Sequence, residues 1–254
     1  MTQIISLSKS WAGRLYRPSF KSRLFVKGVF SYQIDKVEKS LFVEVVGCPG
    51  IGKSTLLNYF EDQGLIEKVF FTKLWSARFK SNADIDTAYR QIIKYKTKNL
   101  DNKKEKIKYI RNTIVPKAMD KFVENEQNAS IFLVDEGLFH HFKYEISENW
   151  KENETLFTKL MNRRVLIHMI ARPEVIAERI LKRYRETGKI LPYYRNKREW
   201  EIAQYCNKAQ EKRKEVMSEF EKKGIPVLSV DAEESAQTIA RNIDGYIKEL
   251  MIHG

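Results

Sequence analysis

The sequence predicts an α/β fold in which helices cover both faces of a parallel β-sheet, and three observations support this. Short apolar runs typical of buried strands alternate with amphipathic helical stretches along most of the chain. The first run leads through a glycine-rich turn directly into a helix. Polar or acidic residues follow several of the runs, at the sheet edge where ligands bind in such folds.

The glycine-rich turn is the most informative stretch. Residues 41–55 read LFVEVVGCPGIGKST and contain the pattern G-x-x-x-x-G-K-[ST] between a predicted strand and a predicted helix. Glycines let backbone N–H groups converge on phosphate oxygens, and the helix dipole favours an anion there. Lys53 can reach the β- and γ-phosphates, and the Ser54 hydroxyl can bind magnesium. The turn predicts a P-loop that binds ATP through Gly47, Cys48, Pro49, Gly50, Ile51, Gly52, Lys53, Ser54 and Thr55.

A second strand ends in adjacent carboxylates. Residues 130–137 read SIFLVDEG, which matches a Walker B strand. Asp135 is therefore expected to hold magnesium together with Ser54. Glu136 projects differently from its neighbour, so it can serve as a base in the substrate pocket or accept backbone hydrogen bonds.

Composition limits the class of protein. The chain has 254 residues, enough for one α/β domain and an appendage. It contains no apolar run of about 18 residues, and its first residues lack the apolar core of a signal peptide. Cys48 and Cys206 make neither a disulfide framework nor a metal cluster. These features predict a cytoplasmic protein.

The net charge of +13 is unevenly distributed. Positive charge gathers in the first forty residues and again between Arg163 and Arg198. Such a surface serves nucleic acid, anionic lipid or phosphorylated small molecules, whereas lysine-rich solvated helices are the simpler explanation. We divide the chain into an N-terminal extension, residues 1–38, and a domain, residues 39–254. The basic and aromatic residues of the extension suit contact with nucleic acid or a membrane surface, or an arm packed on the domain, which we favour.

The remaining elements follow from hydrophobic periodicity. Strands are expected at residues 69–72, 165–171 and 225–230. Helices are expected at residues 54–63, 85–98, 103–124, 155–162, 173–187, 197–222 and 235–251. Pro116 predicts a kink or break in the third of these helices. His140 and His141 are assigned to a loop or a helix start, and without partners at ligand spacing they do not indicate a metal site.

The helix after Pro173 carries a resemblance. Residues 172–175 (RPEV), the arginines at 179, 183 and 185, and residues 191–194 (LPYY) resemble the lid region of deoxynucleoside kinases. Residues 226–231 (PVLSVD) are similar to the last strand of those enzymes and of thymidylate kinases. The resemblance implies a three-layer P-loop NTPase fold, with a five-stranded parallel sheet of order 2-3-1-4-5 and an arginine-bearing lid.

The resemblance also implies roles for individual residues. Lid arginines in that family close over the triphosphate, which implies that Arg179, Arg183 and Arg185 neutralise charge during transfer. The turn with Asp231 and Ala232 would border the adenine. The chain departs from the family at the acceptor site. Residues 72–75 (TKLW) lack the family's glutamate, and residues 135–137 (DEG) replace its Glu-Arg-Ser, so the acceptor is not implied.

The leading hypothesis is a magnesium-dependent kinase that transfers phosphoryl from ATP to a small acceptor. Lys53 and the lid arginines would hold the phosphoryl group, and Asp135 or Glu136 would orient or deprotonate the acceptor. The acceptor is a nucleoside, a nucleotide or a sugar-like metabolite. The alternative is a P-loop ATPase in which Glu136 activates water and hydrolysis drives a conformational or nucleic-acid-linked process.

Overall fold

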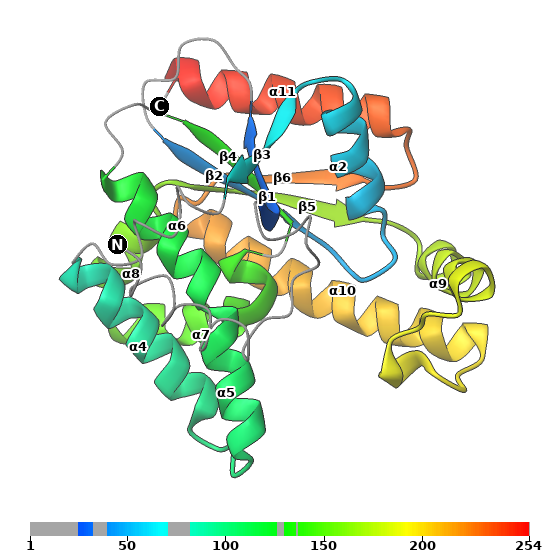
Figure 1. Cartoon of the computed structure of the whole chain (residues 1–254), viewed down its shortest axis with the longest axis horizontal. Helices are drawn as coiled ribbons and strands as arrows, with labels where there is room; N and C mark the ends of the chain where they lie inside the picture. The colour runs from blue at the N-terminus through cyan, green and yellow to red at the C-terminus, as the bar shows by residue number, and fades with distance from the viewer. Residues whose placement is uncertain (1–24, 33–39, 71–81, 126–129, 136, 254) are drawn as a thin grey trace, which may run out of the picture.

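A mixed six-stranded sheet forms the centre of the protein in a computed structural model (Figure 1). The structure describes residues 25–32, 40–70, 82–125, 130–135 and 137–253. The strands are β1 (Phe25–Tyr32), β2 (Leu41–Val46), β3 (Ile66–Phe70), β4 (Ile131–Val134), β5 (Arg164–Ile170) and β6 (Val227–Asp231). Their order across the sheet is β3-β1-β4-β2-β5-β6.

The predicted α/β fold and the relative order of its five predicted strands are confirmed, and the sheet has one strand more. Strand β2 runs parallel to β4 and β5, and β5 runs parallel to β6. Strand β1 is antiparallel to both of its neighbours, β3 and β4, and separates them. The expectation of five strands, all parallel, is therefore corrected to six strands in a mixed sheet.

Strand β1 lies within residues 1–38, which were assigned to an extension before the domain. Its hydrogen bonds to β3 and β4 make residues 25–32 part of the central sheet. The Tyr32 side chain is buried, and its hydroxyl donates to Asp244 Oδ1 at 2.8 Å. Residues 1–24, which hold most of the basic and aromatic run, lie outside the described residues.

The central strands are mostly apolar because helices cover both faces of the sheet. Alternate residues of β2 point to opposite faces: Val43 and Val45 belong to one apolar core, and Val46 belongs to the other. Glu44 interrupts this apolar strand and is buried.

Two groups of helices make the outer layers (Figure 1). One face carries α2 (Lys53–Asp62) and α11 (Ala236–His253). The other face carries α4 (Ala83–Thr97), α5 (Lys103–Asn112), α6 (Ile114–Asn125), α7 (Leu138–Glu152), α8 (Glu154–Met161) and α10 (Glu199–Lys222). Helix α9 (Pro173–Thr187) packs against α10, and the short helix η2 (Pro192–Tyr194) joins them. No helix in the described part of the chain is both long and apolar enough to cross a membrane.

Two helical assignments differ from expectation. The chain between residues 103 and 124 breaks at Thr113, not at Pro116, because proline fits the first turn of the new helix α6. His140 and His141 were assigned to a loop or a helix start, and they lie in the first turns of helix α7, whose full extent was not predicted. Its buried residues Leu138, Phe142 and Ile146 recur at a spacing of four, which is a helical signal.

Candidate phosphate-binding site

The P-loop lies between β2 and α2, where residues 41–55 predicted it. Gly50 and Gly52 have φ values of 85° and 114°, which L side chains rarely adopt. A Cβ at Gly50 would lie 2.5 Å from Cγ1 of Ile180, so helix α9 packs directly on the turn. Ile51 N donates to Cys48 O at 3.2 Å. Glycine is therefore required at residue 50 both by backbone conformation and by the close approach of α9.

Lys53, the first residue of α2, folds back over the turn. Its Nζ donates to the carbonyl oxygens of Gly47 at 3.2 Å and Cys48 at 3.4 Å. Ser54 and Thr55 follow in the first turn of the helix and are exposed. The ammonium group and the helix N-terminus thus converge on one turn, which suits the binding of an anion.

Arg179 ties the P-loop to the turn after β6. Its Nη1 donates to Ile51 O at 2.9 Å, and Nη1 and Nη2 donate to Ala232 O at 3.1 and 3.0 Å. Arg183 and Arg185 lie further along α9 and are exposed. The structure therefore brings one of the three predicted lid arginines to the P-loop and leaves the other two on the helix surface.

The turn after β6 is held from two sides. Asp231 Oδ1 accepts a hydrogen bond from Glu233 N at 2.8 Å, and Ala232 N donates to Ile170 O at 2.7 Å. The Arg172 guanidinium forms a two-pronged ion pair with Glu233, which lowers the pKa of that carboxyl to about 2. Asp231 and Ala232 thus lie beside the P-loop in a fixed conformation.

Asp135 follows β4 at the same sheet edge, and Glu136 lies outside the described residues. Glu44 approaches the turn that leads from Asp135 into α7. A Cβ at Gly137 would collide with the Glu44 carboxylate, and Glu44 Oε2 accepts a hydrogen bond from Phe139 N at 2.9 Å. The sequence analysis missed Glu44, although a single carboxylate in an apolar strand is a visible signal.

Glu44 belongs to a buried ionic network. Arg164 donates through Nη1 to Glu44 Oε1 and through Nη2 to Asp120 Oδ1. The Tyr89 hydroxyl donates to Asp120 Oδ2 at 2.6 Å. Burial raises the pKa of Asp120 to about 6 although Arg164 opposes that shift, and burial also raises the pKa of Tyr89. The network joins α4, α6, β5 and β2 to the start of α7.

Basic side chains gather on the opposite side of the P-loop from α2. Arg213 of α10 is 8% exposed, and its Nη1 lies 3.2 Å from Cys48 Sγ. Burial, with the Arg213 charge as the second cause, lowers the pKa of Lys143 to about 8. Burial also lowers the pKa of His140 to about 3, with His141, Lys53 and other cations adding to the shift. The sequence gives no clear signal for Arg213, because α10 is rich in charged residues throughout.

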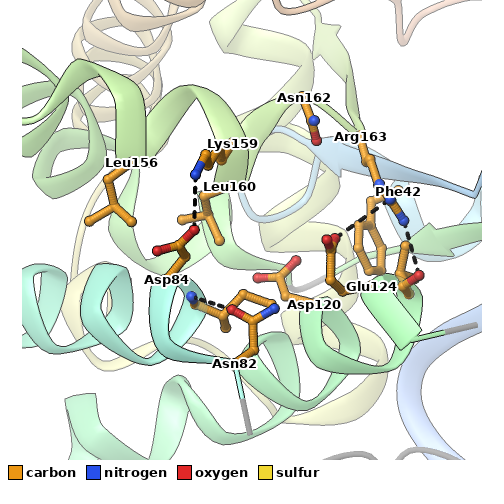
Figure 2. Close-up of a pocket in the computed structure, with 12 residues that line it drawn as sticks. Phe42, Asn82, Asp84, Asp120, Glu124, Leu156, Lys159, Leu160, Asn162 and Arg163 are labelled. Atoms are coloured by element: carbon orange, nitrogen blue, oxygen red, sulfur yellow. Dashed lines mark hydrogen bonds and ion pairs between the residues drawn. The ribbon is translucent and has the colours of Figure 1, made fainter.

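A pocket lies at the other end of the sheet, away from the P-loop (Figure 2). It has a volume of about 290 Å³ and lies near the start of β2 and the residues that precede β5. Asp84 pairs with Lys159 at 3.2 Å, and Glu124 pairs with Arg163 at 3.6 Å along its walls. The fifth charged residue of the lining, Asp120, pairs with Arg164 of the buried network, so each charged residue of the pocket has an ionic partner.

Comparison with known proteins finds similarity to kinases. Adenylate kinase isoenzyme 1 of Rattus norvegicus is 25% identical over 217 residues, covering 85% of this chain and 98% of that protein. Solved structures of deoxyadenosine kinase from M. mycoides, with bound dCTP and with bound dATP, are 18% and 15% identical. Their TM-scores are 0.40 and 0.39, and each covers 82% of this chain and 100% of its own.

The family described as AAA domain matches residues 43–204, which begin in β2, include the P-loop, β4, β5 and α9, and end in α10. This span is more than half of the chain. The chain therefore belongs to the AAA domain family, and it is a P-loop protein that resembles the nucleoside and nucleotide kinases.

Proposed function

We propose that this protein transfers a phosphoryl group from ATP to a small acceptor, in a reaction that depends on magnesium. The P-loop, the acidic end of β4 and an arginine-bearing helix lie at one sheet edge, which supports this reaction. The likeness in sequence to a kinase of similar length supports it further.

The contact between Arg179 and the P-loop is the observation on which the proposal chiefly depends. Its hydrogen bond to Ile51 O fixes helix α9 beside the turn that would hold the triphosphate. Arg183 is one turn further along the same helix, and Arg185 follows. A small movement of this helix end would bring their guanidinium groups toward the phosphates, where bidentate contacts stabilise negative charge.

The proposed transfer is a substitution at the γ-phosphorus. An acceptor oxygen forms a bond to this phosphorus as the bond to the β–γ bridging oxygen breaks, and ADP leaves with that electron pair. If the attacking group is a hydroxyl, its proton passes to the carboxylate of Asp135 or Glu136. Lys53 and the lid arginines neutralise the charge on the transferring group.

The residues present fit magnesium in one specific way. The Ser54 hydroxyl and the Asp135 carboxylate supply oxygen ligands, which a hard cation prefers. The described residues contain no group of three or more His, Cys, Asp or Glu that could hold a metal by themselves. Such a site suits a magnesium ion that is bound largely through substrate phosphates and water, and the ion would supply charge neutralisation at the β- and γ-oxygens.

An acceptor screen tests the proposal against the ATPase alternative. ADP release is measured with nucleosides, nucleotides, sugars and phosphorylated sugars, and separately with DNA and RNA, while products are identified by mass spectrometry. Transfer predicts a phosphorylated small product in amounts equal to the ADP. Strong stimulation by a polymer with no phosphorylated product would instead favour the ATPase.

Arg183→Ala tests the lid. We expect transfer to fall by at least about 100-fold, because a charge that stabilises the transition state is lost, with ATP affinity changed little. Single-turnover transfer and equilibrium binding of a nonhydrolysable ATP analogue measure the two effects. Lys182→Ala, an exposed neighbour on α9, is the matched control and should retain transfer. Normal transfer by Arg183→Ala would show that the lid assignment is wrong.

A further inference from the structure

The α7–α10 side of the P-loop holds a buried positive charge that pairs with no carboxylate of the residues that the structure describes. Arg213 is more than nine-tenths buried, and no ion pair joins it to a carboxylate among the described residues. Its hydrogen bond goes to the thiol of Cys48, which is a weak acceptor and no counter-ion. Its Nε is buried without a hydrogen-bond partner there. Burying an unpaired guanidinium is costly, so its retention beside the P-loop needs an explanation.

The position of Arg213 is fixed by its own helix. Gln210, one turn earlier on α10, accepts a hydrogen bond from Ala171 N at 3.2 Å and donates to Ala171 O at 2.9 Å. Ala171 follows the last residue of β5, so these two bonds fix α10 to the carboxyl edge of the sheet. Arg213 is therefore held at that edge and does not swing freely in solvent.

Lys143 adds a second cation from α7. Lys143 is partly buried, and burial together with the Arg213 charge lowers its pKa to about 8. Glu145, a nearby carboxylate on α7, forms an ion pair with Lys96 at 2.6 Å. No ion pair links Lys143 to a carboxylate in the described part of the chain. His140 is kept neutral there by burial and can donate or accept a hydrogen bond.

Arg213 reaches the P-loop at Cys48, and the two cations belong to different elements from the turn assigned to the adenine. The turn with Ala232 leads into α11 and is joined to the P-loop by Arg179. Arg213 and Lys143 come from α10 and α7, which cover the face of the sheet opposite to α11 (Figure 1). If the proposed function holds, the α7–α10 side faces the acceptor. Two cations that form no ion pair with a carboxylate of the described residues match a dianion better than a neutral hydroxyl compound or a single carboxylate.

We propose that Arg213 and Lys143 bind a phosphate group of the acceptor, so that the acceptor is a phosphate monoester and not a neutral nucleoside or sugar. Arg213 offers the planar fork that pairs with two phosphate oxygens, and Lys143 supplies a point charge beside it. This inference rests on the proposed function, because only phosphoryl transfer makes the bound phosphate part of an acceptor. The anion site itself can be tested without measuring transfer.

The test is a titration with the P-loop filled by magnesium and a nonhydrolysable ATP analogue. Inorganic phosphate, AMP, ribose 5-phosphate and acetate are the anionic probes, and adenosine and ribose are their neutral counterparts. Calorimetry should detect binding of phosphate and the monoesters and much weaker binding of acetate and the neutral probes. Arg213→Gln should weaken phosphate binding by about tenfold or more, because a charged hydrogen-bond donor is lost.

Further variants separate binding from folding. Lys212→Gln removes an exposed charge next to Arg213 on the same helix and should leave phosphate affinity unchanged. Arg213→Lys keeps the charge and should bind phosphate more tightly than Arg213→Gln, with thermal unfolding showing that each variant is folded. Absence of phosphate binding, equal binding by Arg213→Gln, or adenosine and ribose binding as tightly as their phosphates would overturn the proposal.

The outcome also separates this inference from the proposed function. If the protein only hydrolyses ATP but binds phosphate in a way that depends on Arg213, the anion site is supported and the proposed phosphoryl transfer is refuted. If neutral nucleosides are phosphorylated efficiently and phosphate monoesters are not, phosphoryl transfer is supported and the phosphate monoester is refuted as the acceptor.

Discussion

Two arginines are buried on the same side of the sheet, and they differ in what surrounds them. Arg164, at the start of β5, is held by the carboxylates of Glu44 and Asp120. Arg213, beside the P-loop, contacts a thiol and has no carboxylate partner among the described residues. Both have a buried Nε without a hydrogen-bond partner in that part of the chain, so the difference lies in the counter-ions.

This contrast distinguishes a structural charge from a charge that suits a ligand. The Arg164 network fills the space between α4, α6 and the sheet, and through Glu44 it reaches the turn after Asp135. An internal ion pair stabilises only when both partners remain, because either one alone is an uncompensated buried charge. The Arg213 charge has no such carboxylate partner within the part of the chain that the structure describes.

The first way to test the contrast is to remove the paired charge. Arg164→Met should lower the free energy of unfolding by about 3–5 kcal/mol, since Glu44 and Asp120 remain buried without their cation. Urea denaturation followed by circular dichroism measures this loss. Lys159→Met, which breaks an exposed pair with Asp84, is the control and should cost less than about 1 kcal/mol.

The second test uses pH, because the titrations of Asp120 and His168 change stability with pH in opposite directions. The Asp120 pKa is raised to about 6, so its contribution to stability is present near pH 4 and is lost as pH rises through 6. The His168 pKa is lowered to about 4 by burial and by Arg213, so its contribution is present above pH 6.5 and is lost as pH falls.

Removing Asp120 and removing His168 should change the slope of stability against pH in opposite directions. Asp120→Asn should make stability fall more steeply between pH 6 and pH 4, by about 2 kcal/mol in total. His168→Gln should make the fall less steep. Urea midpoints at several pH values measure both slopes, and slopes that change in the same direction would contradict this interpretation.

The third test removes the unpaired charge and should have the smallest effect on stability. The free energy of unfolding of Arg213→Met should lie within about 1 kcal/mol of the wild-type value or exceed it, since no described carboxylate loses its partner. The same urea experiment applies. A loss as large as that of Arg164→Met would show that Arg213 has a structural partner and would remove the basis for a phosphate site.

Local patterns predicted the backbone structure around the P-loop. The run 41–55 predicted β2, the P-loop and α2, because one short stretch contains the strand, the turn and the helix start. The order of the five parallel strands followed from the family resemblance and is confirmed. The roles assigned to Asp231 and the lid arginines remain predictions, and Glu136 and residues 72–75 lie outside the described residues.

The buried charges could not be predicted in this way. Glu44 and Arg164 are 120 residues apart in the sequence, so only the folded sheet brings them together. Arg213 is one basic residue among many on α10, and its burial depends on how Gln210 fixes the helix. Strand β1 was missed because residues 25–32 follow a basic and aromatic run that suggested a surface arm.

The place of β1 has a consequence for how the chain folds. A strand from the first part of the chain lies between β3 and β4, and β4 begins only at Ile131. During synthesis this strand has to wait for a partner on one side, and pairing between distant segments is slow to form. The interior of the sheet therefore closes late, and shortening the chain from its beginning into β1 would remove an internal strand and separate β3 from the rest.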